Sequence, residues 1–370
     1  MASARPVSGD QPLSGRSPTR PTRLLERTLS HDLPRSRWLA LLLVAIFVAL
    51  ALAPVVLPGS KALGVAAKML VFILLVASYD LLLGYTGIVS FAHTMFFGIG
   101  AYGVAIASTR LGAGWASVGI GVALALAASL VLSLVIGLFS LRVKAIFFAM
   151  ITLAVAAAFQ TLASQLSDFT GGEDGLTFRN PEWLSPAFEA FGFDGRHFSY
   201  WLLFVVVTLV FLALLRMVNS PFGRVLQAIR ENDFRAEALG YRVVVYRTLS
   251  NVVAALVATL AGALLALWLR YTGPDTTLSF EIMLDILLIV VIGGMGTLYG
   301  AVVGSVLFVL AQNYLQDLLR LAAGVVEGVP VLAAVLTPDR WLLWLGVLFV
   351  LSVYHFPTGI VGRLRAWSSR

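Results

Sequence analysis

Residues 62–108 read ALGVAAKMLVFILLVASYDLLLGYTGIVSFAHTMFFGIGAYGVAIAS, two apolar runs joined by a glycine-rich junction near 84–90. Each run comes close to the ~20 residues that an α-helix needs to cross the hydrocarbon core of a bilayer. Because unpaired backbone groups are costly in lipid, such runs must be helical. The strands of a membrane β-barrel would alternate in polarity, and runs such as Trp38–Leu52 do not alternate. The stretch therefore predicts an all-α membrane protein.

The composition of the whole chain supports the same fold class. Hydrophobic residues make up 59% of the 370 residues, charged residues make up 12%, and the mean hydropathy is +0.92. Soluble proteins average roughly 45–50% apolar and about 25% charged residues, so these values exclude a soluble enzyme, a disordered chain and a fibrous repeat. The chain has no cysteine, which excludes disulfides, zinc–thiolate sites, iron–sulfur clusters and thiol catalysis.

Apolar runs follow one another along the rest of the chain. We expect a polytopic membrane protein of about ten transmembrane helices, some of them broken at the glycine-rich junctions near 84–90 and 293–300. The membrane domain spans 38–360, between a flexible basic tail at 1–37 and a short tail at 361–370. The ten expected spans are 38–57, 62–83, 90–108, 114–140, 143–165, 199–217, 248–269, 281–297, 298–319 and 341–357.

The charges between these runs predict the orientation. Four segments hold 18 of the 26 basic residues: the N-terminal tail, Arg142 with Lys144, the 216–247 loop and the C-terminus. Cytoplasmic loops of membrane proteins carry an excess of Lys and Arg, so all four segments, and with them both termini, are expected in the cytoplasm. The 166–198 loop has two arginines against six acidic residues and is expected on the outside.

Two glycine-dense stretches carry polar groups at membrane depth, at 79–103 and 292–304. Glycine permits broken or tightly packed helices, and ionisable groups in a membrane usually face a cavity or a partner. Paired glycine-interrupted spans are typical of transporter sites, so we expect a substrate path between the two stretches near the membrane midplane. The alternatives are helix packing, with His93 hydrogen-bonded to a neighbour and Asp285 in a structural ion pair. The candidate residues of the path are Asp80, Tyr85, Gly87, Ser90, His93, Thr94, Phe96, Asp285, Gly293, Gly294, Gly296 and Thr297.

The 220–240 segment reads as a hairpin of short amphipathic helices. Ser220 and Pro221 suit the start of a helix, and Gly240 suits a helix stop. An apolar face formed by Phe222, Val225, Leu226 and Ile229 has no obvious use in water. The hairpin could lie flat on the bilayer, but its mixture of acidic and basic residues favours a protein partner.

Other motifs are weak or absent. The outer sequence Thr170–Leu176 indicates a flexible turn, and a calcium loop is a less favoured alternative because the spacing is not that of an EF-hand. None of the three lysines follows a glycine, so the chain has no phosphate-binding loop and is not expected to hydrolyse ATP. The four histidines form no HExxH motif and no GxSxG occurs, so nothing indicates a catalytic centre, a metal site or a cofactor in this chain.

Five motifs in this order resemble the permeases of ABC importers for branched-chain amino acids, of the LivH/LivM family and most of all its LivM type. The family often has Asn at the position of Asp80 and Ala at that of Thr94. The motifs stand at Gly84–Tyr102, Thr170–Leu176, Ser220–Tyr241, Gly293–Gly300 and Phe356–Gly362.

The resemblance implies a non-catalytic subunit in a bacterial inner membrane. Its implied partners are a homologous LivH-type permease, two cytoplasmic ATP-binding subunits that hold the ATP, and an extracytoplasmic substrate-binding protein, with lipid around the helices and no nucleic acid. Alternatives are a urea-type or amide-type permease, or a secondary transporter that uses Asp80, Asp285 and His93 as an ion relay. The residues that the resemblance implies for ATPase coupling are Phe222, Arg230, Glu231, Asn232, Glu237, Ala238 and Gly240.

Overall fold

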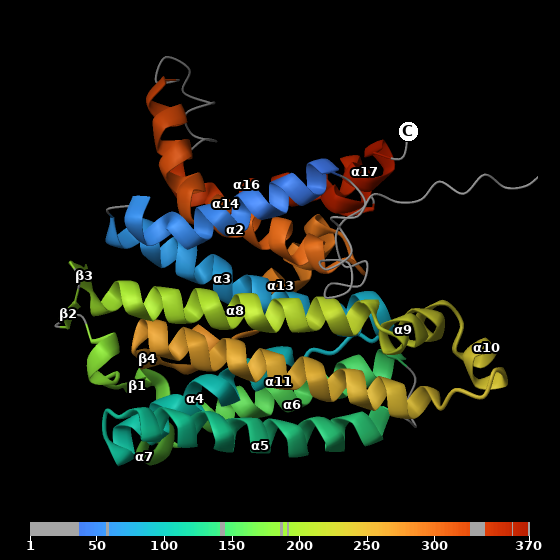
Figure 1. The fold of residues 1–370 in the computed structure, drawn as a ribbon, viewed down its shortest axis with the longest axis horizontal. Helices are drawn as coiled ribbons and strands as arrows, with labels where there is room; N and C mark the ends of the chain where they lie inside the picture. Colours follow the sequence, from blue (N-terminus) through green and yellow to red (C-terminus); the bar gives the residue numbers. More distant parts are fainter. Residues whose placement is uncertain are drawn as a thin grey trace, which may run out of the picture.

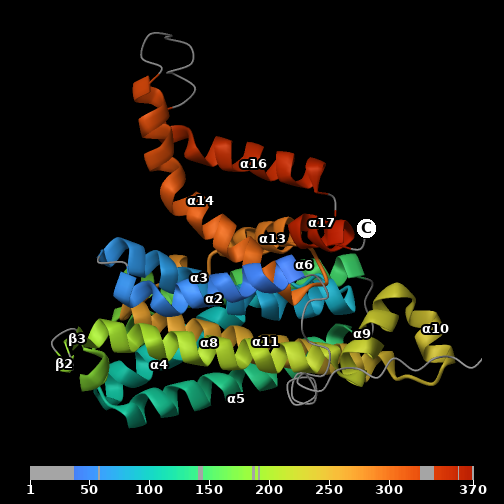
Figure 2. The same cartoon turned by 45° about the horizontal axis from the view of Figure 1, so that its top comes forward.

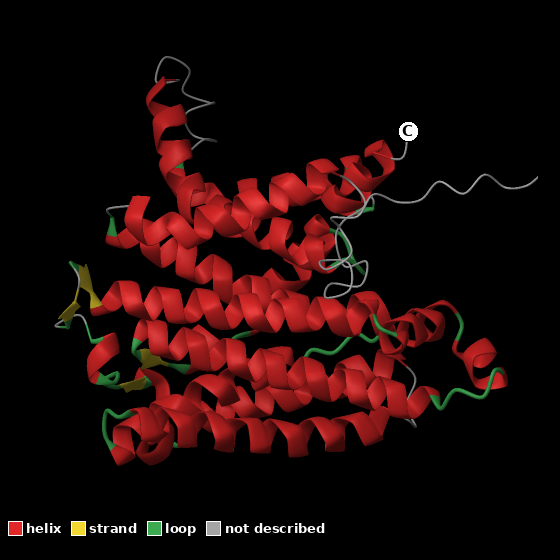
Figure 3. Ribbon diagram, in the orientation of Figure 1, coloured by secondary structure: helices red, strands yellow, loops and turns green. Residues whose placement is uncertain are grey.

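The computed structural model describes residues 37–56, 59–140, 145–185, 188–190, 192–325, 337–356 and 358–368. Apart from Arg37, the expected N-terminal tail lies outside the described residues, and so do Arg142, Lys144 and Pro357. The described chain is almost wholly helical, with four two-residue strands (Figure 3). The all-α fold predicted from the sequence is confirmed.

The first half of the fold runs up to the outer loop expected from the charges. Its elements are α2 (Arg37–Val56), α3 (Ser60–Asp80), the π-helical turn η1 (Leu81–Thr86), α4 (His93–Leu111), α5 (Trp115–Ser140), α6 (Ala145–Gln165), α7 (Ser167–Thr170), η2 (Gly172–Asp174), β1 (Leu176–Thr177), η3 (Glu182–Leu184), β2 (Glu189–Ala190) and β3 (Phe193–Asp194).

The second half contains the predicted hairpin and the C-terminal helices. Its elements are α8 (Gly195–Asn219), α9 (Pro221–Glu231), α10 (Asp233–Ala238), α11 (Val243–Leu269), β4 (Tyr271–Thr272), α12 (Pro274–Thr277), α13 (Phe280–Gly293), α14 (Leu298–Val325), η4 (Pro338–Arg340), α16 (Trp341–His355) and α17 (Gly359–Ser368). The C-terminal tail expected at 361–370 is therefore helical as far as Ser368. Gly359 explains this, because its left-handed φ of 74° lets the chain turn and start a new helix.

Helix α3 lies at the centre of the bundle. It packs against α8, α11 and α14, and every side chain from Met69 to Asp80 is buried. The helix is apolar around its whole circumference, which is the pattern of a helix enclosed by others. In Figure 2, α14 leans out of the bundle and α16 lies beside it.

Helices α4 and α11 approach each other backbone to backbone. A Cβ at Gly100 would overlap the carbonyl oxygen of Thr259, and a Cβ at Gly262 would overlap that of Phe97. Glycines on the facing sides of two helices permit this close approach of the two backbones, because they carry no side chain. The glycines of this part of the sequence therefore do serve helix packing.

Nine helical segments of the described chain are long and apolar enough to cross a membrane. The exception among the ten expected spans is α4, whose 19 residues include His93, Arg110 and three glycines that lower its apolarity. Helix α13 ends at Gly293, four residues before the predicted boundary at 297. The turn at Gly294–Thr297 is thus a break between α13 and α14, as the glycine-rich junction indicated.

The outer loop and the hairpin lie at opposite ends of the bundle. The four short strands and α7 mark one end, and α9 with α10 mark the other (Figure 1). This agrees with the placement of 166–198 and 216–247 on opposite sides of the membrane. Which end faces the cytoplasm stays a prediction from the charges.

Cysteine labelling tests that prediction. The chain has no cysteine, and Glu182 and Glu231 are both exposed, so Glu182→Cys and Glu231→Cys each give one reactive site. We expect a membrane-impermeant maleimide added to intact cells to label Glu182→Cys alone. Inside-out vesicles should give the reverse pattern, and labelling of Glu231→Cys in intact cells would invert the topology.

Candidate functional site

The first glycine-rich junction breaks a helix inside the bundle. Helix α3 continues as η1 to Thr86, Gly87 adopts a left-handed φ of 75°, and α4 begins only at His93. Ser90 and His93 are buried, whereas Gly87 is exposed and the two residues after it are partly buried, so protein encloses the non-helical backbone only at its α4 end. Irregular backbone at membrane depth occurs where protein or a water-filled cavity covers it.

The second junction touches the first. The N–H of Gly296 donates a hydrogen bond of 2.8 Å to Oδ1 of Asp80. The guanidinium of Arg230, from α9, donates to the carbonyl oxygen of Gly84. Gly84 has to be a glycine here, because a Cβ would overlap the Asp80 carboxylate and the Gly296 nitrogen. Two distant glycine-rich stretches and the hairpin therefore meet at one point.

A fourth motif completes this cluster. The backbone of Gly359 lies so close to that of Gly294 that a Cβ on Gly359 would overlap it. We call Asp80, Gly84, Arg230, Gly294, Gly296 and Gly359 the junction cluster. Its contact with α9 places it at the hairpin end of the bundle. The substrate path expected between the two stretches near the membrane midplane stays a prediction.

His93 forms a local hydrogen bond. Its Nε2 lies 2.8 Å from Ser78 Oγ, and that hydroxyl donates to the carbonyl of Leu75. Because Ser78 donates its only hydroxyl proton to Leu75, its oxygen accepts a hydrogen bond from Nε2 of His93, and Nε2 carries the ring proton. This geometry agrees with the alternative to a substrate path, in which His93 is hydrogen-bonded to a neighbouring side chain. Thr94 and Phe96, the next candidates along α4, are also buried, and so is Tyr85 in η1.

Asp285 belongs to a separate polar group. The side-chain amide of Gln312 in α14 donates to Asp285 Oδ2 (3.3 Å), and Lys68 Nζ in α3 donates to Gln312 Oε1 (2.7 Å). Gln312 thus bridges an acid and a base that hold three helices together. Neither Lys68 nor Gln312 is among the site residues expected from the sequence. Lys68 could have been found, because a lysine within an apolar run needs a partner.

The apolar face of the hairpin is used within the chain. Leu226 and Ile229 are buried, and Phe222 stacks on Tyr246 of α11 at 5.7 Å between ring centroids. Leu226 and Ile229 are therefore not free for a partner, whereas Phe222 and Val225 are only partly buried, and a coupling role for Phe222 stays a prediction. The sequence shows that the face is apolar but not that α11 returns to cover it.

The exposed side of the hairpin is formed by other residues. Phe234 and Leu239 have exposed fractions of 80% and 71%, and neither stood out in the sequence. The candidate coupling residues Glu231, Asn232, Glu237, Ala238 and Gly240 are exposed around them.

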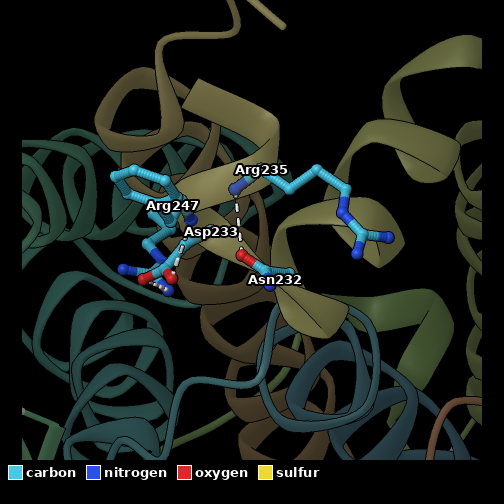
Figure 4. A network of polar contacts seen from close by, with 5 residues as sticks. Asn232, Asp233, Arg235 and Arg247 are labelled. Atoms are coloured by element: carbon cyan, nitrogen blue, oxygen red, sulfur yellow. Dashed lines mark hydrogen bonds and ion pairs between the residues drawn. The ribbon is translucent and has the colours of Figure 1, made fainter. Parts of the chain in front are cut away.

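The fold of the hairpin around α10 is fixed by polar contacts. Asn232 caps α10 by accepting the N–H of Arg235 (2.9 Å), and Asp233 pairs with Arg247 at 3.3 Å (Figure 4). The exposed tip is thereby held on α11 in a defined position.

The Thr170–Leu176 motif is a structural turn. Gly171, Gly172 and Gly175 all have left-handed φ, and β1 pairs with β4 directly after the turn. Among the residues that the structure describes, no group of acidic or histidine side chains could hold a metal ion. The turn joins α6 to the segment after α11 at the end of the bundle that carries the short strands.

A groove of about 540 Å³ opens between α4, α5 and α6 near that end. Its walls are almost entirely apolar. The hydroxyl of Tyr102, which lines the groove, is buried and has no hydrogen-bond partner among the described residues. Other residues of the lining are Ile99, Ile106, Leu124, Phe159, Leu162 and Thr170.

Broken helices inside an apolar bundle, with an exposed hairpin at one end, define a polytopic membrane transport component. The model of one protein family matches residues 61–353, and its description is "Branched-chain amino acid transport system / permease component". The chain belongs to this family, and the family resemblance read from the five motifs is confirmed.

Curated relatives carry the same description. The high-affinity branched-chain amino acid transport system permease protein LivM of Escherichia coli is 25% identical over 322 residues, covering 82% of this chain and 74% of the relative. The LivM protein of Salmonella typhimurium is 24% identical (75% and 69% covered). A probable LivM protein of Methanocaldococcus jannaschii is 27% identical (66% and 69% covered). No solved structure matches the chain.

Proposed function

We propose that the chain is the permease subunit of an ABC importer that moves branched-chain amino acids into the cytoplasm. The observation that carries this proposal is the junction cluster, in which the breaks of two membrane-spanning segments meet a hairpin with an exposed tip. Separate ATPase subunits bind the tip of the hairpin, and an extracytoplasmic binding protein delivers the substrate to the opposite end. The membrane is the inner membrane of a bacterium; two of the relatives are permease proteins from the bacteria Escherichia coli and Salmonella typhimurium.

The groove between α4, α5 and α6 supports an amphipathic substrate. Its apolar walls match a branched aliphatic side chain. Urea and simple amides have little or no apolar surface, so the groove gives them no comparable contact. The groove therefore favours an aliphatic amino acid over the urea-type and amide-type alternatives.

A second permease is expected to complete the pore. None of the described side chains of α16 is buried within this chain, and its surface is apolar, with Leu342, Leu343 and Val350 exposed. A LivH-type partner or lipid covers this helix in the membrane.

The geometry gives little support to the secondary transporter. Asp80 binds Gly296, His93 binds Ser78, and Asp285 binds Gln312. The three groups that would form the ion relay thus belong to three separate hydrogen-bonded sites.

Uptake by the assembled complex tests the proposed function. The permease, its partner permease, the two ATPases and the binding protein are reconstituted in vesicles, and radiolabelled leucine, urea and acetamide are offered. We expect leucine uptake that requires ATP, stops with orthovanadate and is unaffected by a protonophore. Leucine uptake by the permease alone in response to a proton or sodium gradient would overturn the proposal, and preference for urea would replace its substrate.

A further inference from the structure

Arg230 lies in the last turn of α9, but its guanidinium reaches into the membrane domain. It donates to the carbonyl of Gly84, and its Cγ would stand 3.2 Å from a Cβ at Gly87. On the other side, a Cβ at Gly296 would stand 2.8 Å from Arg230 Nη1. One side chain from the hairpin thus touches the breaks of both glycine-rich stretches.

The break in the first stretch explains why an arginine is found there. The last carbonyl groups of a helix lack N–H partners and carry partial negative charge. The N–H groups of Gly87 and Ile88 both donate to the carbonyl of Leu82, so neither serves the Gly84 carbonyl. A guanidinium has five donors, and Arg230 uses one of them to satisfy this oxygen.

Asp80 offers Arg230 a second acceptor. Its side chain is 1% exposed. Oδ1 accepts the N–H of Gly296, whereas Oδ2 is buried without a hydrogen-bond partner among the described residues. A buried carboxylate oxygen without a partner is unfavourable. The Asp80 carboxylate lies against Gly84, where a Cβ would overlap Oδ1 and stand 2.7 Å from Cγ, so a small shift of α9 would bring the guanidinium to the carboxylate.

We propose that Arg230 is the positioning residue that carries movement of the hairpin to both helix breaks, by passing from the Gly84 carbonyl to the free oxygen of Asp80. The inference rests on the proposed function, because the ATPase subunits supply the movement of the hairpin. In the state described here, Arg230 holds the end of η1. In the alternative state, Arg230 binds Oδ2 of Asp80, and the ion pair draws the carboxylate away from the Gly296 N–H that Oδ1 accepts in the present state.

This exchange couples two parts of the membrane domain. Release of the Gly84 carbonyl frees the end of η1, and a weakened Asp80–Gly296 hydrogen bond frees the turn between α13 and α14. Both breaks then move together, because one guanidinium serves both. Arg230 as a whole is exposed, but its guanidinium is held by the Gly84 carbonyl, so an ATPase contact through its charge would require this hydrogen bond to break.

Three substitutions in the complete reconstituted complex test this role. Arg230→Gln removes the charge, and Asp80→Asn keeps an acceptor for the Gly296 N–H but removes the carboxylate. Arg224→Gln is the matched control, because Arg224 is exposed on the same helix and is outside the junction cluster. The first readout is the ratio of ATP hydrolysed to leucine taken up. The second is the distance between spin labels at Ile88→Cys and Met295→Cys, with and without vanadate trapping.

We expect the ATP-to-leucine ratio to rise about tenfold in Arg230→Gln and in Asp80→Asn, within the range of typical coupling between sites. The double variant should be no worse than either single variant, because both remove the same step. Arg224→Gln should behave as the unsubstituted protein. The label distance should change on vanadate trapping with Arg230 and Asp80 intact, and stay constant in the Arg230→Gln and Asp80→Asn backgrounds.

The outcomes separate this inference from the proposed function. If the unsubstituted complex transports leucine with ATP but the label distance stays constant on trapping, Arg230 has no such role. The same conclusion holds if Arg230→Gln and Asp80→Asn both keep the normal ratio. The label distance is measured with both native residues present, so the test remains decisive even where a substituted chain does not assemble. Absence of ATP-dependent uptake by the unsubstituted complex would instead contradict the proposed function.

Discussion

Gly262→Leu is expected to abolish the folded protein. Residue 262 faces α4 where the two helices are in backbone contact, and even a Cβ there would overlap the Phe97 carbonyl oxygen. Backbone atoms do not yield as the end of a side chain does, so α4 and α11 would have to separate along their whole contact. We expect a loss of more than about 4 kcal/mol, a size of effect that single substitutions reach only at sites such as this.

The measurement is size-exclusion chromatography in detergent with a thermal aggregation curve. Gly100→Leu, which meets the Thr259 carbonyl from the other side of the same contact, should fail in the same way. Gly119→Leu in α5 is the matched control, because nothing lies within 4 Å of a Cβ at that position. A monodisperse peak and an unchanged aggregation midpoint for Gly262→Leu would show that the two helices are not in contact.

Phe234→Asp combined with Leu239→Asp should stop transport without harming the fold. Both side chains are largely exposed, so their replacement removes little packing within this chain. An aromatic anchor at the centre of an interface contributes about 2 kcal/mol or more to binding, which corresponds to a loss of affinity of roughly thirtyfold. We expect leucine uptake in ATP-loaded vesicles to fall by at least that factor, because the ATPase no longer binds the hairpin tip.

The exposed Gln227 of α9 provides the control. Gln227→Asp adds a negative charge, one of the two that the double variant adds, on the same hairpin but away from the two apolar side chains, and should leave uptake unchanged. Copurification of the ATPase with each variant separates lost binding from lost activity. Normal uptake by the Phe234→Asp, Leu239→Asp variant would assign the ATPase contact to another surface.

The sequence predicts the helices of this protein better than their contacts. Apolar runs of membrane-spanning length and glycine-rich interruptions are local properties, so the helices and the breaks near Gly84 and Gly294 could be located in advance. The partner of a polar group is not a local property. Lys68 and Asp285 are far apart in the chain, and only the packing of three helices shows that Gln312 bridges them.

The hairpin shows the same limit. Its amphipathic pattern was correctly recognised, but a pattern does not say which surface covers an apolar face. Tyr246, which stacks on Phe222, lies in α11, and α10 separates it from α9 in the chain. Arg230 is one of the residues that the resemblance implies for ATPase coupling, and it is exposed, but the sequence does not show that its guanidinium returns to the bundle. Its contact with Gly84 depends on a helix break 146 residues earlier.

The enclosure of α3 has a consequence for the order in which the protein is made. The ribosome delivers α3 early, yet two of the helices that surround it, α11 and α14, come from much later in the chain. Asp80 and the N–H that it accepts from Gly296 are separated by 216 residues. At about 5–20 residues per second, that separation corresponds to roughly ten to forty seconds of synthesis. During this interval the carboxyl group of Asp80 lacks the N–H of Gly296 as its hydrogen-bond partner. A chain that stops before Gly296 keeps this group unpaired. We expect a membrane protease or chaperone to recognise the unpaired carboxyl group as the mark of an unfinished chain.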